Sequence, residues 1–144
     1  MHSADIKHWD AQARSGFVYT PDKQIDTWRS YATEASLGAS WQGDCDDLVA
    51  TVLDLLGQAG LPLTQRYRLE VGSKGSTTVN HLVGAVLSAE GQFWIVGDTF
   101  GSAYLAPEMR HTSIEYQCLS ETEVIRAGAP WVLSSNNTNL TGDK

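Results

Sequence analysis

The strongest structural signal in the sequence is an acidic segment that leads directly into an apolar helix. Asp44 is a favoured N-cap residue, and Asp46 and Asp47 place negative charge in the first turn, where the helix dipole favours it. The apolar residues that follow share one helix face, at Leu48, Val52, Leu55 and Leu56. Glycines and a proline within 57–62 predict the end of the helix. The sequence therefore predicts one buried helix against which the rest of the chain packs.

The residues before this helix are more polar and predict a second, amphipathic helix. After a turn at Pro21-Asp22, apolar side chains recur on one face, at Ile25, Trp28, Ala32 and Ala35. The segment 37–40 ends this helix, and residues 41–43 are expected to form a loop that leads to Asp44. We expect the second helix to cover part of the core.

From residue 66 onward the patterns are those of strands. Alternating or continuous apolar runs bounded by turn residues predict strands at 66–71, 80–87, 92–99 and 113–119, with a short last strand at 131–133. The segment 72–76 is expected to be a flexible loop. Helices followed by sequential strands are typical of the α+β class, so we predict helices packed on an antiparallel sheet.

The second and third of these strands are predicted to form a hairpin. If Glu90 and Gly91 are the two central turn residues, His81 lies opposite Phe100 on the neighbouring strand. Asp98 is two residues from Phe100 and therefore shares its face of the sheet. We expect His81 and Asp98 to be diagonal neighbours whose side chains can meet.

The length and charge of the chain limit its organisation and its partners. Its 144 residues and net charge of −7 argue for a single domain and against binding to nucleic acid or to an anionic membrane. We expect one domain over 1–133 and a flexible tail over 134–144, where polar residues leave little to bury. Because residues 1–10 contain no apolar run of the secretory type, the expected location is cytoplasmic.

The two cysteines differ in their surroundings. Two cysteines do not make the framework of a small secreted domain, so we expect free thiols. Cys118 stands in a strand pattern and is predicted to be a small buried residue, whereas Cys45 stands at a helix start, where free N–H groups favour a thiolate. A reactive cysteine also needs an imidazole and a group that orients it, and His81 and Asp98 are the candidates. The remaining histidines lack metal-ligand spacing and are expected at the surface, at His2, His8 and His111.

These residues carry a family resemblance. The run Trp41-x-Gly43-Asp44-Cys45-Asp46-Asp47 is followed 36 residues after the cysteine by His81, and 17 residues later by Asp98. This order and spacing resemble the bacterial transglutaminase-like cysteine proteinases of the LapG type. The resemblance covers about residues 41–101. It departs from the family pattern after His81, where Leu-Val-Gly stands in place of Ala-Val-Leu, and at Thr99, where the family has asparagine.

The resemblance implies a papain/transglutaminase-like fold and a set of residue roles. Cys45 would be the nucleophile, His81 the general base and acid, and Asp98 the residue that orients the imidazole. The Cys45 N–H would form part of an oxyanion hole, supported by Trp41 or Gln42.

The implied activity is that of a cysteine peptidase or amidase that cleaves or transfers a protein amide bond through a thioester. A protein or peptide is the expected substrate. The chemistry requires no cofactor. The resemblance also implies a possible calcium ion, with Asp44 and Asp46 as ligands. Because Ca²⁺ takes six to eight oxygens, these carboxylates supply only part of its shell.

Two other functions fit parts of the sequence. The run Asp44-Cys45-Asp46-Asp47 also resembles the start of the cysteine motif in NlpC/P60-like peptidoglycan peptidases, although that family has Ser-Gly after the cysteine. A non-catalytic module that binds a protein partner on the same fold is the second alternative. The brevity of the chain suits a bacteriophage or bacterial protein, acting in a host cell or a virion.

Overall fold

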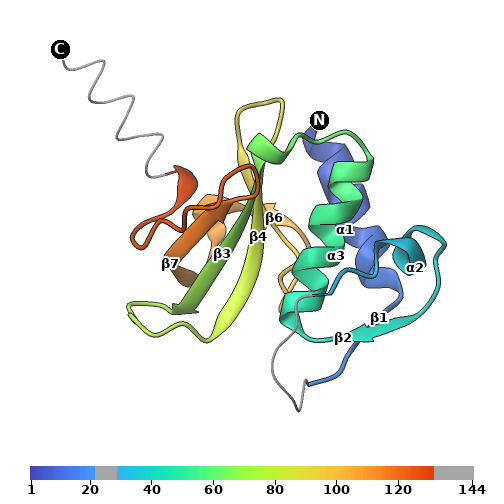
Figure 1. Ribbon diagram of the computed structural model, residues 1–144, viewed down its shortest axis with the longest axis horizontal. Coiled ribbons are helices and arrows are strands. Elements are labelled where there is room, and N and C mark those ends of the chain that lie inside the picture. Colours follow the sequence, from blue (N-terminus) through green and yellow to red (C-terminus); the bar gives the residue numbers. More distant parts are fainter. Residues whose placement is uncertain (22–28, 132–144) are drawn as a thin grey trace.

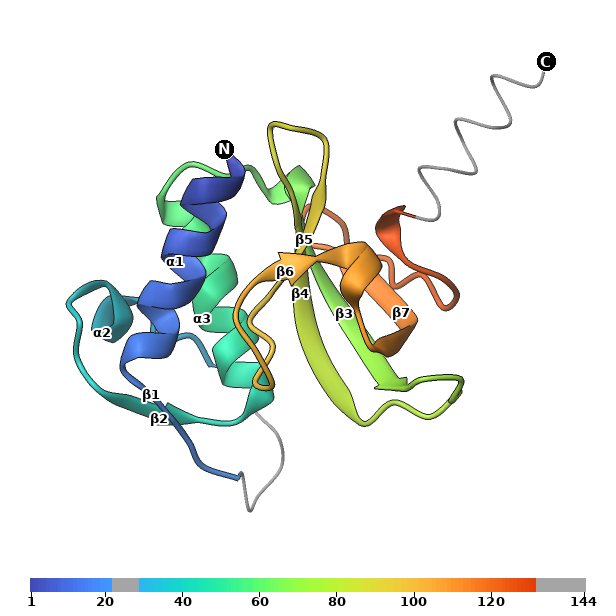
Figure 2. The same ribbon diagram turned by 180° about the vertical axis from the view of Figure 1, so that it is seen from behind.

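The computed structural model describes residues 1–21 and 29–131, which form a helical layer beside an antiparallel sheet (Figure 1). The helices are α1 (Ser3–Ser15), α2 (Ala32–Ser36) and α3 (Cys45–Gln58). They lie on one side of the sheet in both views (Figures 1 and 2), and α3 contacts both α1 and the sheet. The predicted α+β class is confirmed. No helix among the described residues combines the length and the apolar character that a membrane span needs.

The main sheet has five strands in the order β6-β5-β4-β3-β7, and every neighbouring pair is antiparallel. Its strands are β3 (Arg66–Ser73), β4 (His81–Leu87), β5 (Phe93–Val96), β6 (Tyr104–Leu105) and β7 (His111–Cys118). Two short 3-10 helices, Leu63–Gln65 and Ala106–Glu108, precede β3 and follow β6. A separate parallel pair, β1 (Phe17–Tyr19) and β2 (Trp41–Gly43), joins the end of α1 to the start of α3. β2 therefore replaces the loop expected at 41–43.

The core lies on both faces of β4. Leu82 and Val86 face the helices, where they pack with the fully buried apolar residues of α3, while Val83 and Ala85 face a second cluster on the other side of the sheet. The second cluster is covered by Ala106, Met109, Ile125 and Trp131. A central strand buried on both faces explains the uninterrupted apolar run that follows His81.

The start of α3 forms as its acidic residues predict. The Asp44 carboxylate accepts hydrogen bonds from the backbone N–H groups of Asp46 and Asp47, and the Asp47 carboxylate accepts one from the Asp44 N–H. This reciprocal capping box satisfies orphan donors at the helix N-terminus. It fixes the point at which the helix begins, and therefore the position of Cys45.

The structure differs from the sequence expectation near both ends of the chain. α1 was not expected, because its residues are mostly polar and only three are buried, at Ile6, Asp10 and Ala13. The helix expected around 25–35 is present as α2 in its second half, and its first half lies largely outside the described residues. Trp131 has helical backbone rather than strand backbone, and 132–144, with the expected tail, also lie outside the described residues.

The β4–β5 hairpin has a different register from the predicted one. Ala85 pairs with Ile95 rather than with Val96, because the loop contains three residues, Ala89 to Gly91, instead of two. Gly91 has φ +78° and takes the left-handed position that ends a three-residue hairpin loop. Continued regularly, this register would put Asp98 on the opposite sheet face from His81.

Gly97 restores the contact between those two residues. β5 ends at Val96, and Gly97 has φ +68°, a conformation that turns the chain out of the strand. A Cβ atom at Gly97 would also lie 3.0 Å from the Val49 Cα of α3. The turn and the close approach to α3 both require glycine here, and together they direct Asp98 back towards His81.

We expect Gly97→Ala to destabilise the fold by more than the roughly 1 to 2 kcal/mol that a left-handed backbone costs an L-residue. The excess arises because Val49 has to move. Gly91→Ala is the matched control, since Gly91 has a similar φ but open space around its Cα. Denaturant unfolding of both variants measures the difference, and equal losses would contradict the proposed steric role of Gly97.

Candidate functional site

Cys45 is the first residue of α3, and it is partly buried. Its Sγ lies 3.6 Å from Asp46 Oδ1. Burial, followed by the charge of Asp46, raises the pKa of the Cys45 thiol to about 12, against a smaller opposing effect of the Leu82 N–H. This reverses the expectation that the helix N-terminus favours a thiolate in the resting protein.

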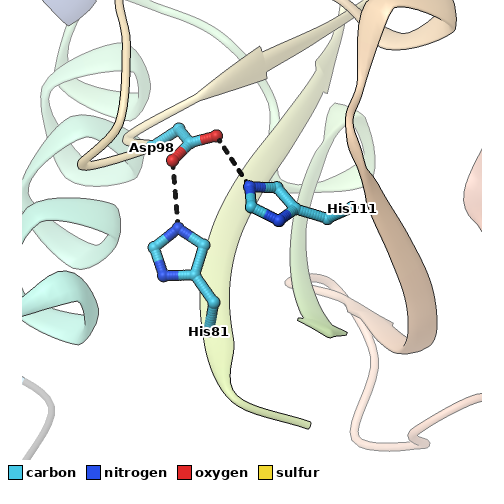
Figure 3. Close-up of side chains that lie close together, drawn as sticks. All are labelled: His81, Asp98 and His111. Atoms are coloured by element: carbon cyan, nitrogen blue, oxygen red, sulfur yellow. Dashed lines mark hydrogen bonds and ion pairs between the residues drawn. The ribbon is translucent and has the colours of Figure 1, made fainter. Parts of the chain in front are cut away.

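His81 and Asp98 meet as the sequence predicts, although through a different backbone path. His81 is the first residue of β4, and its Nε2 lies 3.0 Å from Asp98 Oδ1. Figure 3 shows the ring with its Nδ1 directed away from Asp98. Asp98 thus holds one ring nitrogen of His81 and leaves the other nitrogen for a different partner.

The Asp98 carboxylate is nearly inaccessible to solvent and is surrounded by donors. Oδ1 accepts a hydrogen bond from the Phe100 N–H at 3.0 Å, and Oδ2 accepts one from the Tyr104 hydroxyl at 2.8 Å. Burial would raise the pKa of Asp98, but the hydrogen bonds from His81, Phe100 and Tyr104 outweigh it and lower the pKa to about 2. Asp98 is therefore ionised at neutral pH despite its burial.

His111 lies in the same cluster and not at the open surface where the sequence analysis put it. It begins β7, and its Nε2 lies 3.4 Å from Asp98 Oδ2. Its ring centroid is 5.1 Å from that of His81. The sequence offered little sign of this, because β7 reaches the site by pairing with β3, the strand next to β4.

A cleft of about 660 Å³ contains Cys45, His81 and His111. Aromatic side chains form part of its wall, at Phe17, Tyr19 and Phe100. No sequence pattern indicated a role for these three residues, which come from the short strand β1 and from the loop after β5. The cleft places a thiol, an imidazole and an apolar wall on one surface, an arrangement suited to nucleophilic chemistry on a bound chain segment.

The two residues named as oxyanion support lie elsewhere. Trp41 is 4% exposed, stacks on Tyr31, and donates its indole N–H to the Ala13 carbonyl at 3.1 Å. Gln42 is exposed and borders a different hollow, next to Arg29 and Asp47. Neither residue is among those that line the Cys45 cleft. In the capping box, the Asp44 carboxylate accepts from the N–H groups of Asp46 and Asp47, the two residues that follow Cys45.

The acidic residues around Cys45 do not assemble a calcium shell within the described part of the chain. Asp44 Oδ1 accepts two backbone N–H groups, and the two oxygens of Asp47 accept one each, from Asp44 and Arg29. Asp44 Oδ1 and both Asp47 oxygens already accept backbone N–H groups, and Ca²⁺ takes six to eight oxygens, so these acidic side chains supply only part of a shell. Calcium ligation by Asp44 and Asp46 stays a prediction, and no step below depends on it.

A buried ion pair on α1 fixes the loop that carries Asp98. Asp10 is 1% exposed, and its carboxylate accepts hydrogen bonds from the N–H groups of Gly97 at 2.8 Å and Ala103 at 3.0 Å. Arg14 Nε donates to Asp10 at 2.7 Å, and Arg14 also donates to the Asp98 carbonyl. α1 therefore holds both ends of the segment 97–103. An aspartate and an arginine four residues apart in a polar segment were the only sequence sign of this pair.

Solved structures with the same arrangement of elements exist, although no family model and no curated protein matches the sequence. Legionella pneumophila LapG superposes with a TM-score of 0.59 over 98% of this chain and 78% of its own, at 15% identity. The fold is similar to that of LapG. Its calcium-bound form gives a TM-score of 0.59 at 15% identity, over 94% of this chain and 79% of LapG. The EGTA-treated form gives 0.60 at 16%, over 88% and 67%.

The likeness to the LapG fold extends over most of the chain, including regions outside 41–101. At 15% identity it establishes the fold alone. The roles of individual side chains therefore depend on the distances and contacts described above.

We expect Asp10→Asn to lower the free energy of unfolding by about 3 kcal/mol, because it leaves Arg14 without its buried partner. The Arg14 side chain is 19% exposed, so the loss of unfolding free energy should lie near the lower end of the range for breaking a buried ion pair. Asp5→Asn, on the exposed side of the same helix, is the matched control and should change little. Denaturant unfolding tests this, and similar stabilities for the two variants would refute the bracing role of Asp10.

Asp98 should make stability depend on acid pH. Its pKa is about 2 in the folded chain and roughly 4 when unfolded. The stabilisation is therefore present above pH 4 and is lost as the pH falls through 2, and it amounts to roughly 2 to 3 kcal/mol. In unfolding experiments from pH 5 to 2, Asp98→Asn should lack this component while Asp5→Asn keeps it. An unchanged pH slope in Asp98→Asn would contradict the assignment.

Proposed function

We propose that the protein is a transglutaminase-like cysteine peptidase or amidase that acts on a protein amide bond through a thioester. Cys45 is the nucleophile, His81 the general base and acid, and Asp98 the group that orients the imidazole. The observation that carries the proposal is the 3.0 Å contact between His81 Nε2 and Asp98 Oδ1, in a cleft that also contains Cys45. The likeness to the LapG fold supports it.

The first step in this mechanism is proton transfer. Because burial and Asp46 keep the resting thiol protonated, Cys45 does not act as a preformed thiolate. With its Nε2 proton held by Asp98, His81 offers the Nδ1 lone pair to the thiol. As Sγ bonds to the substrate carbonyl carbon, the thiol proton passes to Nδ1, and the ionised Asp98 stabilises the imidazolium.

The second step releases the amine. The carbonyl π electrons move to the oxygen, and the Cys45 N–H, at the positive end of α3, is the donor available to that oxyanion. When the intermediate collapses, the C–N bond breaks and the leaving nitrogen takes the proton from His81. A thioester on Cys45 remains. Water, deprotonated by His81, then gives the acid, whereas an amine acceptor gives a new amide.

The aromatic wall of the cleft suits a peptide segment with an apolar side chain. Tyr19 is 55% exposed and Phe100 79% exposed, and both line the cleft beside the thiol. Exposed aromatic rings next to a nucleophile supply apolar contact area for a bound chain. We infer that residues next to the scissile bond contact these rings.

The decisive experiment compares Cys45→Ala with Cys118→Ala. Turnover of protein and peptide amides should be abolished in the first variant and kept in the second, because Cys118 lies at the end of β7, with its Sγ 3.1 Å from Ser120 Oγ and outside the cleft. Both variants should unfold at similar denaturant concentrations. Equal activity of Cys45→Ala would refute the proposal. Release of cell-wall stem peptides instead of protein fragments would favour the NlpC/P60-like alternative.

One observation favours a second function, a non-catalytic module that binds a protein in the same cleft. The raised pKa of Cys45 means that the thiol of the free protein is protonated at neutral pH. Alkylation by iodoacetamide against pH separates the two functions. A binding module should show the same slow, alkaline profile in wild type and in His81→Ala. At a catalytic site, His81 should take the thiol proton as the sulfur attacks iodoacetamide, so wild-type alkylation near neutrality should be slowed in His81→Ala.

A further inference from the structure

Two histidines converge on one buried carboxylate (Figure 3). His81 comes from the start of β4, His111 from the start of β7, and Asp98 from the loop after β5. Among the described residues, this is the one group of three such side chains whose ligand atoms all lie within 4.8 Å of one another. The proposed catalytic chemistry uses His81 and Asp98 and leaves His111 without a role.

The donor set and its spacing match a zinc site. Two imidazole nitrogens and a carboxylate oxygen are ligands that Zn²⁺ takes with one position left open. His81 Nε2 lies 3.0 Å from Asp98 Oδ1, and His111 Nε2 lies 3.4 Å from Oδ2. Tetrahedral ligands about 2.0 to 2.1 Å from a zinc ion are themselves separated by roughly 3.3 Å. The two imidazoles contact different oxygens of Asp98, and one ligand atom from each of the three residues lies within 4.8 Å of the others, so side-chain rotation would bring the three donors to one ion.

The carboxylate is already supported from behind. Tyr104 donates to Oδ2 and the Phe100 N–H donates to Oδ1, while Arg14 holds the Asp98 carbonyl. Metal-binding carboxylates and histidines characteristically have such outer hydrogen bonds, which fix their orientation. Asp98 would keep its place when the two imidazoles turn from it to an ion.

The cluster is accessible from solvent. His81 and His111 line the Cys45 cleft, and Asp98 and His111 border a second hollow beside Tyr104 and Arg110. An ion can therefore reach the three ligands, and water from either hollow can fill the open position.

We propose that His81, Asp98 and His111 form a binding site for Zn²⁺ or a similar transition-metal ion. The imidazoles bind through Nε2, so each neutral ring carries its proton on Nδ1. His81 Nδ1 then cannot accept the thiol proton of Cys45. Metal binding thus competes with the base function of His81, a consequence that rests on the proposed function, whereas the binding itself does not.

The test uses the metal-free full chain, titrated with Zn²⁺ by calorimetry and with Co²⁺ by visible absorption. One ion per chain should bind, and Co²⁺ should give the intense bands of a low-coordinate N/O site. Tyr104→Phe removes an outer hydrogen bond and should weaken binding roughly 10- to 100-fold. His111→Ala removes a ligand and should weaken it further, with His111→Gln as a second variant that preserves side-chain size.

Control variants identify other binding modes. His8→Ala and His2→Ala alter histidines outside the cluster and should bind as wild type does. The site is refuted if no ion binds or if binding is lost in either control. It is also refuted if binding persists in both His111 variants but disappears in Cys45→Ala, which would indicate a Cys45–His81 pair.

Alkylation of Cys45 separates the metal site from the catalytic proposal. Saturating Zn²⁺ should slow iodoacetamide modification in wild type and leave the rate in His111→Ala unchanged. If the ion binds through His111 but alkylation is unaffected, the metal site stands and the base role of His81 fails.

Discussion

The buried Asp98 carboxylate is the interaction on which the candidate site depends. Its side chain is 3% exposed, so its charge is stabilised mainly by the donors that four separate segments direct towards it. Each of those segments is in turn oriented by the acceptor. The charge therefore joins β4, the loop after β5, β6 and β7 at one point. A neutral residue of the same shape would leave these elements packed but would remove the common electrostatic centre.

Burial has opposite outcomes for the protonation of Asp98 and Cys45, two residues of the proposed chemistry. Asp98 is ionised because donors compensate for its burial, whereas Cys45 is protonated because burial and a neighbouring carboxylate act together. Substrate binding would displace water from the cleft and bring a carbonyl to the thiol, so proton transfer would coincide with bond formation.

The local parts of the fold were predictable, and the long-range parts were not. The capping box at Asp44 and the strand runs after residue 66 have patterns whose cause lies within a few residues. The contact between His81 and Asp98 was predicted from a hairpin register that differs by one residue from the observed register. The two side chains meet because the chain turns at Gly97. His111 and Asp10 each contact residues on elements that are distant from them in the sequence or in the sheet order. A polar residue braced by such contacts looks, in one sequence, like an ordinary surface residue.

The bracing of the site by α1 has a consequence for the order in which the molecule folds. Asp10 binds N–H groups that stand 87 and 93 residues later in the chain. Contacts of such separation form late, because the entropy of closing a long loop must be met first. During synthesis, Cys45 and His81 leave the ribosome before the loop that orients the imidazole can dock on the N-terminal helix. An emerging chain would thus hold its thiol without an oriented base, and the reactive arrangement would arise only after residue 103 has been synthesised.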